Sequence, residues 1–192
     1  MDLHAAIGEV YSSWAHGRLG DPESGAWSMR KALETYVAQG NRLWVPYFLG
    51  LRAELEAEIG SADVALTLID EGLAISQETG ERLTDSFLYR LRGDILLKRD
   101  PANPAPAEDA FRAAIAIAEA QKARSFELQA ALSLAKLYQS TGRPAEARAI
   151  LSPALEGFSP TPEMPEIAEA QALLATLEER DEVKTARRSG GE

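Results

Sequence analysis

The amino-acid sequence predicts an all-α protein, folded as a right-handed α-solenoid of four helical hairpins followed by a capping helix. Three observations favour this class. Apolar residues recur at spacings of three and four, which is the period of a helix with one buried stripe. Glycine and proline separate these segments and mark turns. Small residues return about every forty positions, as expected where pairs of helices pack closely and repeat.

The clearest hairpin lies between Ala123 and Leu151. Gly142 divides this segment in two, and glycine readily adopts the left-handed conformation that closes a helix. Pro144 stands in the first turn of the second helix, where proline removes no hydrogen bond. The apolar stripes on the two sides consist of Leu128, Leu132, Ala135, Tyr138, Ala147, Ile150 and Leu151.

Internal alignment indicates how often this unit recurs. Residues 32–44 match residues 72–84 at an offset of 40, which places Gly40 on Gly80. A further shift of 42 brings residues 114–126 into the same frame, and a weaker copy leads the chain. The sequence therefore predicts four hairpins, over residues 3–38, 43–79, 82–121 and 124–157.

Each hairpin is expected to hold two helices that approach closely through small residues. First helices are predicted at about residues 3–17, 43–59, 82–99 and 124–141, and second helices at about 22–38, 62–79, 105–121 and 144–157. The small residues are Ser13, Ala53, Gly93 and Ala135 in the first helices, and the pairs Gly25 and Ala32, Ala65 and Gly72, Ala107 and Ala114, and Ala147 and Ala154 in the second.

The C-terminal region is expected to cover the last hairpin. The prolines of residues 158–165 interrupt the helical pattern, and an amphipathic segment over 165–178 follows them. Repeat arrays need such a terminal helix because their last unit otherwise exposes an apolar face. The repeat domain is thus placed at residues 1–178, and residues 179–192 are predicted to form a disordered tail because they contain almost no apolar residue.

The N-terminal end is expected to be uncovered, because the first helix carries Ile7, Val10, Tyr11 and Trp14 and no polar helix precedes it. Two interpretations remain open. A second copy of the chain covers this face, which would make a homodimer, or the chain is a piece of a larger protein with earlier repeats.

Composition restricts the kinds of partner. The net charge is −10 with basic residues interleaved among acids, which argues against nucleic acid. No apolar run is long enough to span a membrane, and the N-terminus lacks an export signal. The chain contains no cysteine, which is compatible with the cytoplasmic location that we expect.

No constellation of residues indicates catalysis. His4 and His16 are twelve residues apart on one predicted helix, about 18 Å, so they cannot share a metal ion. Glu54 and Glu58 lie one turn apart, which is the spacing of a solvated helix face or of a cation site. We expect no enzyme activity, no cofactor and no metal.

The candidate binding surface is the concave groove that first helices line in stacked hairpins. It combines aromatic rings, an arginine and charges of both signs, a composition typical of protein-binding hot spots. Filling of the core between repeats is the competing interpretation for Tyr47, Leu51 and Phe87. The predicted groove residues are Tyr11, Trp14, Arg18, Tyr47, Leu51, Glu54, Glu58, Phe87, Arg90, Asp94, Lys98, Gln129, Ser133 and Lys136.

The helical hairpins and their small residues resemble the tetratricopeptide repeat (TPR), with units of about 40 residues. The phrases QETGERL (residues 77–83), QKARSFELQAALSLAKLYQSTGRPAEARAIL (121–151) and FSPTPEMPEIAEAQALL (158–174) are similar to the C-terminal repeat region of large bacterial signalling proteins. Those proteins carry an adenylate/guanylate cyclase or transcriptional-regulator domain and a predicted ATPase of the STAND class.

This resemblance implies a regulatory region that senses partners, while nucleotide chemistry belongs to other domains. The chain departs from the full-length pattern, since it has neither a glycine-rich phosphate loop nor the metal carboxylates of a cyclase. The leading hypothesis is therefore a noncatalytic scaffold for signal transduction that binds a protein segment, or neighbouring cyclase or ATPase domains of the same polypeptide, in the groove. The alternative is a structural element that pairs two chains through the first helix.

Overall fold

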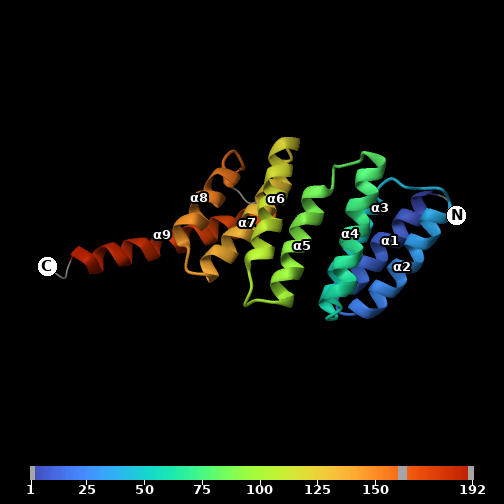
Figure 1. The fold of residues 1–192 in the computed structure, drawn as a ribbon, viewed down its shortest axis with the longest axis horizontal. Coiled ribbons are helices and arrows are strands. Elements are labelled where there is room, and N and C mark those ends of the chain that lie inside the picture. Colours follow the sequence, from blue (N-terminus) through green and yellow to red (C-terminus); the bar gives the residue numbers. More distant parts are fainter. Residues whose placement is uncertain (1–2, 160–163, 190–192) are drawn as a thin grey trace. The chain divides into compact units, whose positions relative to one another are not determined.

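The computed structural model describes residues 3–159 and 164–189, and within these ranges every regular element is a helix (Figure 1). The helices are α1 (Leu3–Arg18), α2 (Pro22–Ala38), α3 (Val45–Glu58), α4 (Ala62–Thr79), α5 (Asp85–Arg99), α6 (Ala105–Gln121), α7 (Arg124–Ser140), α8 (Pro144–Leu155) and α9 (Pro165–Ser189). The all-α prediction is confirmed for this part of the chain.

Helix boundaries follow the local signals in the sequence, with two later starts. The structure begins α3 at Val45 rather than at residue 43 because Trp44 has a φ of 66°, a left-handed conformation that an α-helix cannot contain. It begins α5 at Asp85 rather than at residue 82, after Thr84. Gly142 has a φ of 76°, as its role in the turn before Pro144 requires.

The C-terminal helix is longer than predicted. The sequence predicts disorder from residue 179, whereas α9 continues to Ser189, so that prediction is wrong for the described part of the segment. The reason is local: residues 179–189 contain neither glycine nor proline, and most of them have good helix propensity. Low apolar content argues against burial but does not by itself prevent a helix from continuing. Residues 190–192 lie outside the described ranges.

The structure divides into two compact units, residues 1–110 and 111–192, and the boundary falls within α6. In the first unit α1 pairs with α2 and α3 pairs with α4. Each second helix also contacts the next first helix, α2 against α3 and α4 against α5. In addition α1 contacts α3, and α3 contacts α5, so these three helices form one layer of this unit (Figure 1). Whether a single domain spans residues 1–178 stays a prediction.

The small residues of the repeat lie where helices approach each other. Ala53 and Ala65 are completely buried in the first unit, as are Ala135 and Ala147 in the second. The closest approach is between α1 and α2, where a Cβ atom built on Gly25 would lie 2.5 Å from the Cα of Gly17. These two helices can pack at this distance only because neither has a side chain at the contact.

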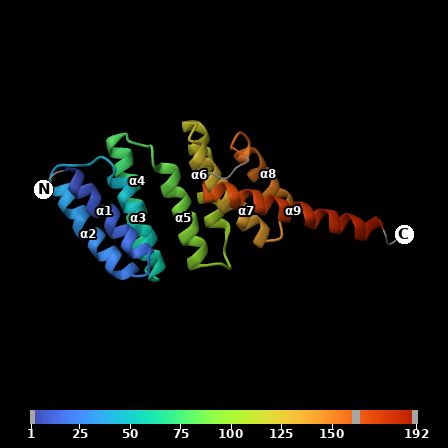
Figure 2. The same cartoon turned by 180° about the vertical axis from the view of Figure 1, so that it is seen from behind.

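The second unit is held together by α9, which contacts both α7 and α8 (Figure 2). Its apolar face buries Ile167, Ala170 and Leu177. The guanidinium of Arg148 on α8 donates a hydrogen bond of 2.8 Å to the carbonyl of Leu177. Burial of this face explains why α9 packs on the last hairpin although proline-rich sequence separates the two.

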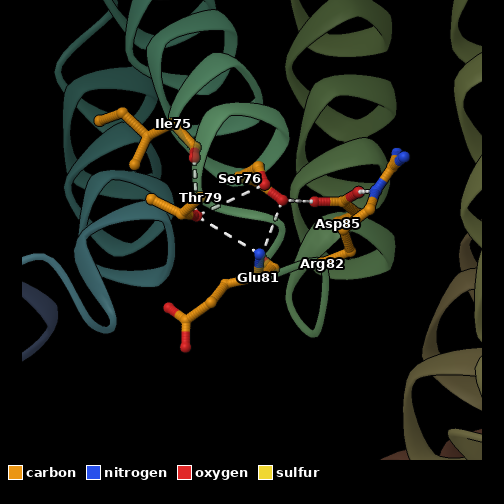
Figure 3. A network of polar contacts seen from close by, with 6 residues as sticks. All are labelled: Ile75, Ser76, Thr79, Glu81, Arg82 and Asp85. Carbon is orange, nitrogen blue, oxygen red and sulfur yellow. Dashed lines mark hydrogen bonds and ion pairs between the residues drawn. The ribbon is translucent and has the colours of Figure 1, made fainter.

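A buried polar cluster joins α4 to the start of α5 (Figure 3). The Ser76 hydroxyl lies within hydrogen-bond distance of both the Asp85 carboxylate and the Glu81 carbonyl, which is 2.9 Å away. Arg82 Nε donates to the other oxygen of Asp85 at 2.7 Å. Ser76 and Asp85 expose at most 1% of their surface, so each satisfies a polar group that would otherwise be costly to bury.

The same arginine–acid pair recurs 42 residues later in the second unit. Arg124 donates to both oxygens of the Glu127 carboxylate at 2.7 and 2.8 Å, and it also donates to three carbonyls at the end of α8. The sequence signal for this pair is an acid three residues after Arg82 and after Arg124, which the alignment of small residues did not use.

Candidate interaction surface on the first helices

The surface of interest lies on the layer formed by α1, α3 and α5 in the first unit, called here the first-helix face. Trp14, Glu54 and Asp94 are 40 residues apart in succession and stand at equivalent positions of the three helices. Trp14 Nε1 donates a hydrogen bond of 3.2 Å to Glu54 Oε2, which joins α1 to α3. The sequence repeat therefore becomes a row of side chains in contact.

Arg90 continues this row from α3 to α5. Its guanidinium lies 2.6 Å from Asp94 Oδ2 and 3.9 Å from Glu54 Oε1. It also lies over the ring of Phe87, 5.6 Å from the ring centroid, a favourable cation–π arrangement. Arg90 is thus held between two carboxylates and a ring, with only 17% of its side chain exposed.

A second row runs one helical turn further along the same helices. Arg18 on α1 forms an ion pair with Glu58 on α3. Lys98 on α5 donates a hydrogen bond of 2.6 Å to the carbonyl of Ala57 at the end of α3. Arg18, Glu58 and Lys98 are exposed, so this row offers charges of both signs to solvent.

Aromatic rings support one end of the face. Tyr47 packs against Phe87 with ring centroids 5.0 Å apart, and Tyr11 makes an edge contact of 5.6 Å with Phe48. Leu51 and Phe87 expose only 3% and 6% of their surfaces. These two residues therefore fill the core between hairpins and are not accessible for binding, which corrects the prediction that placed them in the groove.

The predicted residues of the second unit have partners on α9. Gln129 donates a hydrogen bond of 3.0 Å to Glu166, and Lys136 Nζ lies 2.8 Å from Glu169. Ser133 is partly buried. In this unit α9 occupies the side of α7 that the sequence assigned to the groove, because α9 contacts α7 as α3 contacts α1.

Burial sets the protonation behaviour of Glu54 at the centre of the face. The removal of water raises the pKa of its carboxyl, while Arg90, the hydrogen bond from Trp14 and the more distant Arg18 oppose this increase. Burial also raises the pKa of Tyr47, and the nearby Tyr11 and Glu54 contribute to this increase. The carboxyl of Glu54 is thus poorly solvated and depends on its neighbours for polar contacts.

The four residues on which the expected N-terminal surface rests differ in exposure. Val10 is completely buried, Ile7 and Trp14 are partly buried, and Tyr11 is 43% exposed. A shallow hollow of about 590 Å³ lies between α1 and α2, and its lining is small and polar apart from Trp27. Val10 thus faces the inside of the unit while Tyr11 is exposed, and whether a second chain or further repeats cover this end stays a prediction.

No metal site is found among the described residues. They contain no group of three or more histidine, cysteine, aspartate or glutamate side chains that could hold a metal ion. In the same part of the chain no helix is both long enough and apolar enough to cross a membrane. The first-helix face combines ion pairs, rings and the partly buried carboxyl of Glu54, an arrangement suited to recognition of a polar surface.

Comparison of the chain with protein-family models and with curated proteins finds no match.

Proposed function

We propose that this chain is a noncatalytic interaction module that binds an extended protein segment on the first-helix face. The observation that carries the proposal is the linked row from Trp14 through Glu54 and Arg90 to Asp94, which crosses three helices. A surface that is already ordered binds a flexible segment at a lower entropic cost, because only the segment loses freedom.

The charges of the face determine the chemistry of the segment. Arg18 and Arg90 both have acidic partners on the face, while Glu58 and Asp94 remain 36% and 40% exposed. A purely acidic segment would meet these carboxylates, and a purely basic one would meet Arg18 and Lys98. A segment with alternating charges and an aromatic or aliphatic residue near Tyr11 fits best.

The architecture that we propose for this function is a right-handed α-solenoid of TPR-like hairpins. Its support is the repeated contact order of the first unit, in which each first helix contacts the next. The resemblance of the sequence to the C-terminal repeat region of bacterial signalling proteins supports a regulatory role. The partners would then be cyclase or ATPase domains of the same polypeptide. The cytoplasm is the compartment consistent with this role.

The test uses peptides selected on the immobilised chain from a random library, since the natural partner is unidentified. Dissociation constants of the selected peptides are then measured for the parent, Trp14→Ala, Arg18→Glu and Trp27→Ala. Trp27 is the matched control because it is a tryptophan 59% exposed on α2, away from the layer of first helices.

We expect Trp14→Ala and Arg18→Glu to weaken binding at least tenfold and Trp27→Ala to leave it within twofold. Equal affinity for all four proteins would contradict the proposal. Arg90→Glu is a poor test, because it would place a third carboxylate beside Glu54 and Asp94 and destabilise the unit.

One observation favours the alternative, a structural element that pairs two chains through α1. Tyr11 and Trp27 expose 43% and 59% of their surfaces at the N-terminal hairpin. Light scattering separates the two functions. A stable dimer that becomes a monomer on Tyr11→Ser would favour pairing, whereas a monomer that still selects peptides would favour the interaction module.

A further inference from the structure

A second surface of the first unit is a cleft of about 460 Å³ that the first-helix face does not include. It lies along the contact of α2 with α3, and Glu71 of α4 lines one side. Its walls combine aliphatic side chains, among them Leu33, Val45 and Leu49, with the guanidiniums of Arg30 and Arg52. Clefts of this volume with a few polar groups are typical of sites for small molecules.

The repeat provides an internal comparison for this cleft. A shift of 40 residues places Arg30 on Asp70 and Arg52 on Arg92. At the later contact, between α4 and α5, Asp70 and Arg92 form an ion pair. At the earlier contact, between α2 and α3, both positions are arginine and both line the cleft. The carboxylate that the chain supplies at one contact is thus replaced by a second positive charge at the other.

Within the described part of the chain, the ion pairs of Arg30 and Arg52 are with acids on their own helices. Arg30 Nε lies 3.9 Å from Glu34 on α2, and Arg52 donates a hydrogen bond of 3.1 Å to Glu56 on α3. Arg52 Nε is buried and has no hydrogen-bond partner among the described residues. Arg92 Nε is also buried without a hydrogen-bond partner among the described residues. The two contacts therefore differ in whether a carboxylate on the other helix pairs with the arginine.

The two contacts also differ in the size of one side chain. Leu49 corresponds to Tyr89, whose ring lies beneath the guanidinium of Arg92, 5.9 Å from its central carbon. The smaller leucine leaves room that the tyrosine ring occupies at the later contact. The earlier contact therefore has no carboxylate at the position of Asp70 and no aromatic ring at the position of Tyr89.

We propose that this cleft binds a small organic molecule with one carboxylate and an apolar body. The carboxylate accepts hydrogen bonds from Arg52 and pairs with Arg30, in the manner of Asp70 at the later contact. The apolar body lies on Val37, which lines the cleft and is 46% exposed, next to the buried Leu33, Val45 and Leu49. Glu34 and Glu71 on the same walls oppose a second negative charge, so the preferred ligand is a monocarboxylate.

The test measures binding of octanoate by isothermal titration calorimetry, with octylamine and acetate as probes that lack the charge or the tail. Two variants reproduce the later contact within the cleft. Arg30→Asp introduces the missing carboxylate, and Leu49→Tyr introduces the missing ring. Lys31→Asp is the matched control, because it makes the same charge change one residue away, where the side chain lines a different hollow.

We expect octanoate to bind the parent and Lys31→Asp with similar affinity, and Arg30→Asp and Leu49→Tyr at least tenfold more weakly. Arg30→Asp should unfold at a temperature close to that of the parent, because it loses the ion pair with Glu34 and gains one with Arg52. Equal binding of octylamine or acetate, or equal octanoate binding by Arg30→Asp, would overturn the proposal, as would no octanoate binding to the parent. None of these results depends on peptide binding at the first-helix face.

Discussion

Substitution of Gly25 by alanine tests whether the close approach of α1 and α2 is essential. The added Cβ would lie 2.5 Å from the Cα of Gly17, 2.8 Å from its nitrogen and 3.0 Å from the carbonyl oxygen of Ser13. All three atoms belong to the backbone, so no side chain can rotate away. Ordinary contact begins at about 3.4 Å, and α1 must therefore move by about 0.9 Å or deform.

The magnitude follows from two opposing effects. Alanine in place of glycine favours a helix by about 1 kcal/mol. Insertion of a methyl group into a tightly packed contact costs about 1–3 kcal/mol, and a backbone neighbour places this site near the upper end. We expect Gly25→Ala to lower the free energy of unfolding of the first unit by about 1–2 kcal/mol.

Gly8→Ala is the matched control on the neighbouring helix. A Cβ atom at Gly8 meets nothing within 4 Å, so only the gain in helix propensity remains, about 0.5–1 kcal/mol. Urea unfolding is followed by tryptophan fluorescence, which reports on the first unit alone because Trp14, Trp27 and Trp44 are the three tryptophans of the chain. If Gly25→Ala is as stable as Gly8→Ala, the contact between α1 and α2 is not as close as we describe.

Three further substitutions address the second unit, the polar cluster and the partly buried carboxyl of Glu54. Ala135→Leu overfills a completely buried site and should cost about 1–3 kcal/mol in urea unfolding followed by circular dichroism; an unchanged midpoint would refute the packing between α7 and α8. Ser76→Ala leaves Asp85 without one hydrogen-bond donor and should cost about 1–3 kcal/mol, whereas a loss below about 0.5 kcal/mol would mean that Arg82 alone satisfies this carboxylate. Glu54 has a raised pKa in the folded chain, so the folded state retains its proton to a higher pH than the unfolded state, and stability falls as pH rises through that interval. The parent should therefore gain stability relative to Glu54→Gln as pH decreases from 7 towards 4.5, and a constant difference would contradict the pKa shift.

The sequence predicted the helices well because their signals are local. Apolar spacing, turn glycines such as Gly142 and first-turn prolines such as Pro144 act within a few residues. Trp14 and Glu54 are 40 residues apart and hydrogen-bonded, since equivalent positions of stacked repeats become neighbours, but the sequence alignment was not used to predict this contact. The part of the tail up to Ser189 was predicted wrongly, because low apolar content was taken to exclude a helix that needs no burial to continue.

The candidate site was predicted less completely. A helical stripe indicates which residues share a side, but it does not indicate how far a neighbouring helix covers them. Neighbouring helices bury Leu51 and Phe87, and Lys136 forms an ion pair with Glu169 on α9. The two arginines of the α2–α3 cleft escaped notice, because their importance depends on comparison with the Asp70–Arg92 ion pair across another helix contact.

The sequence by itself determined that this chain forms helices in pairs, where each pair turns, and which small residues permit close packing, because these properties depend on the conformational preferences and spacing of nearby residues. The tertiary structure alone decided which side chains of the first-helix face remain accessible, which acids compensate which arginines, and where a cleft stays open. Those features depend on distances between residues some forty positions apart, and such distances are set only when the helices pack.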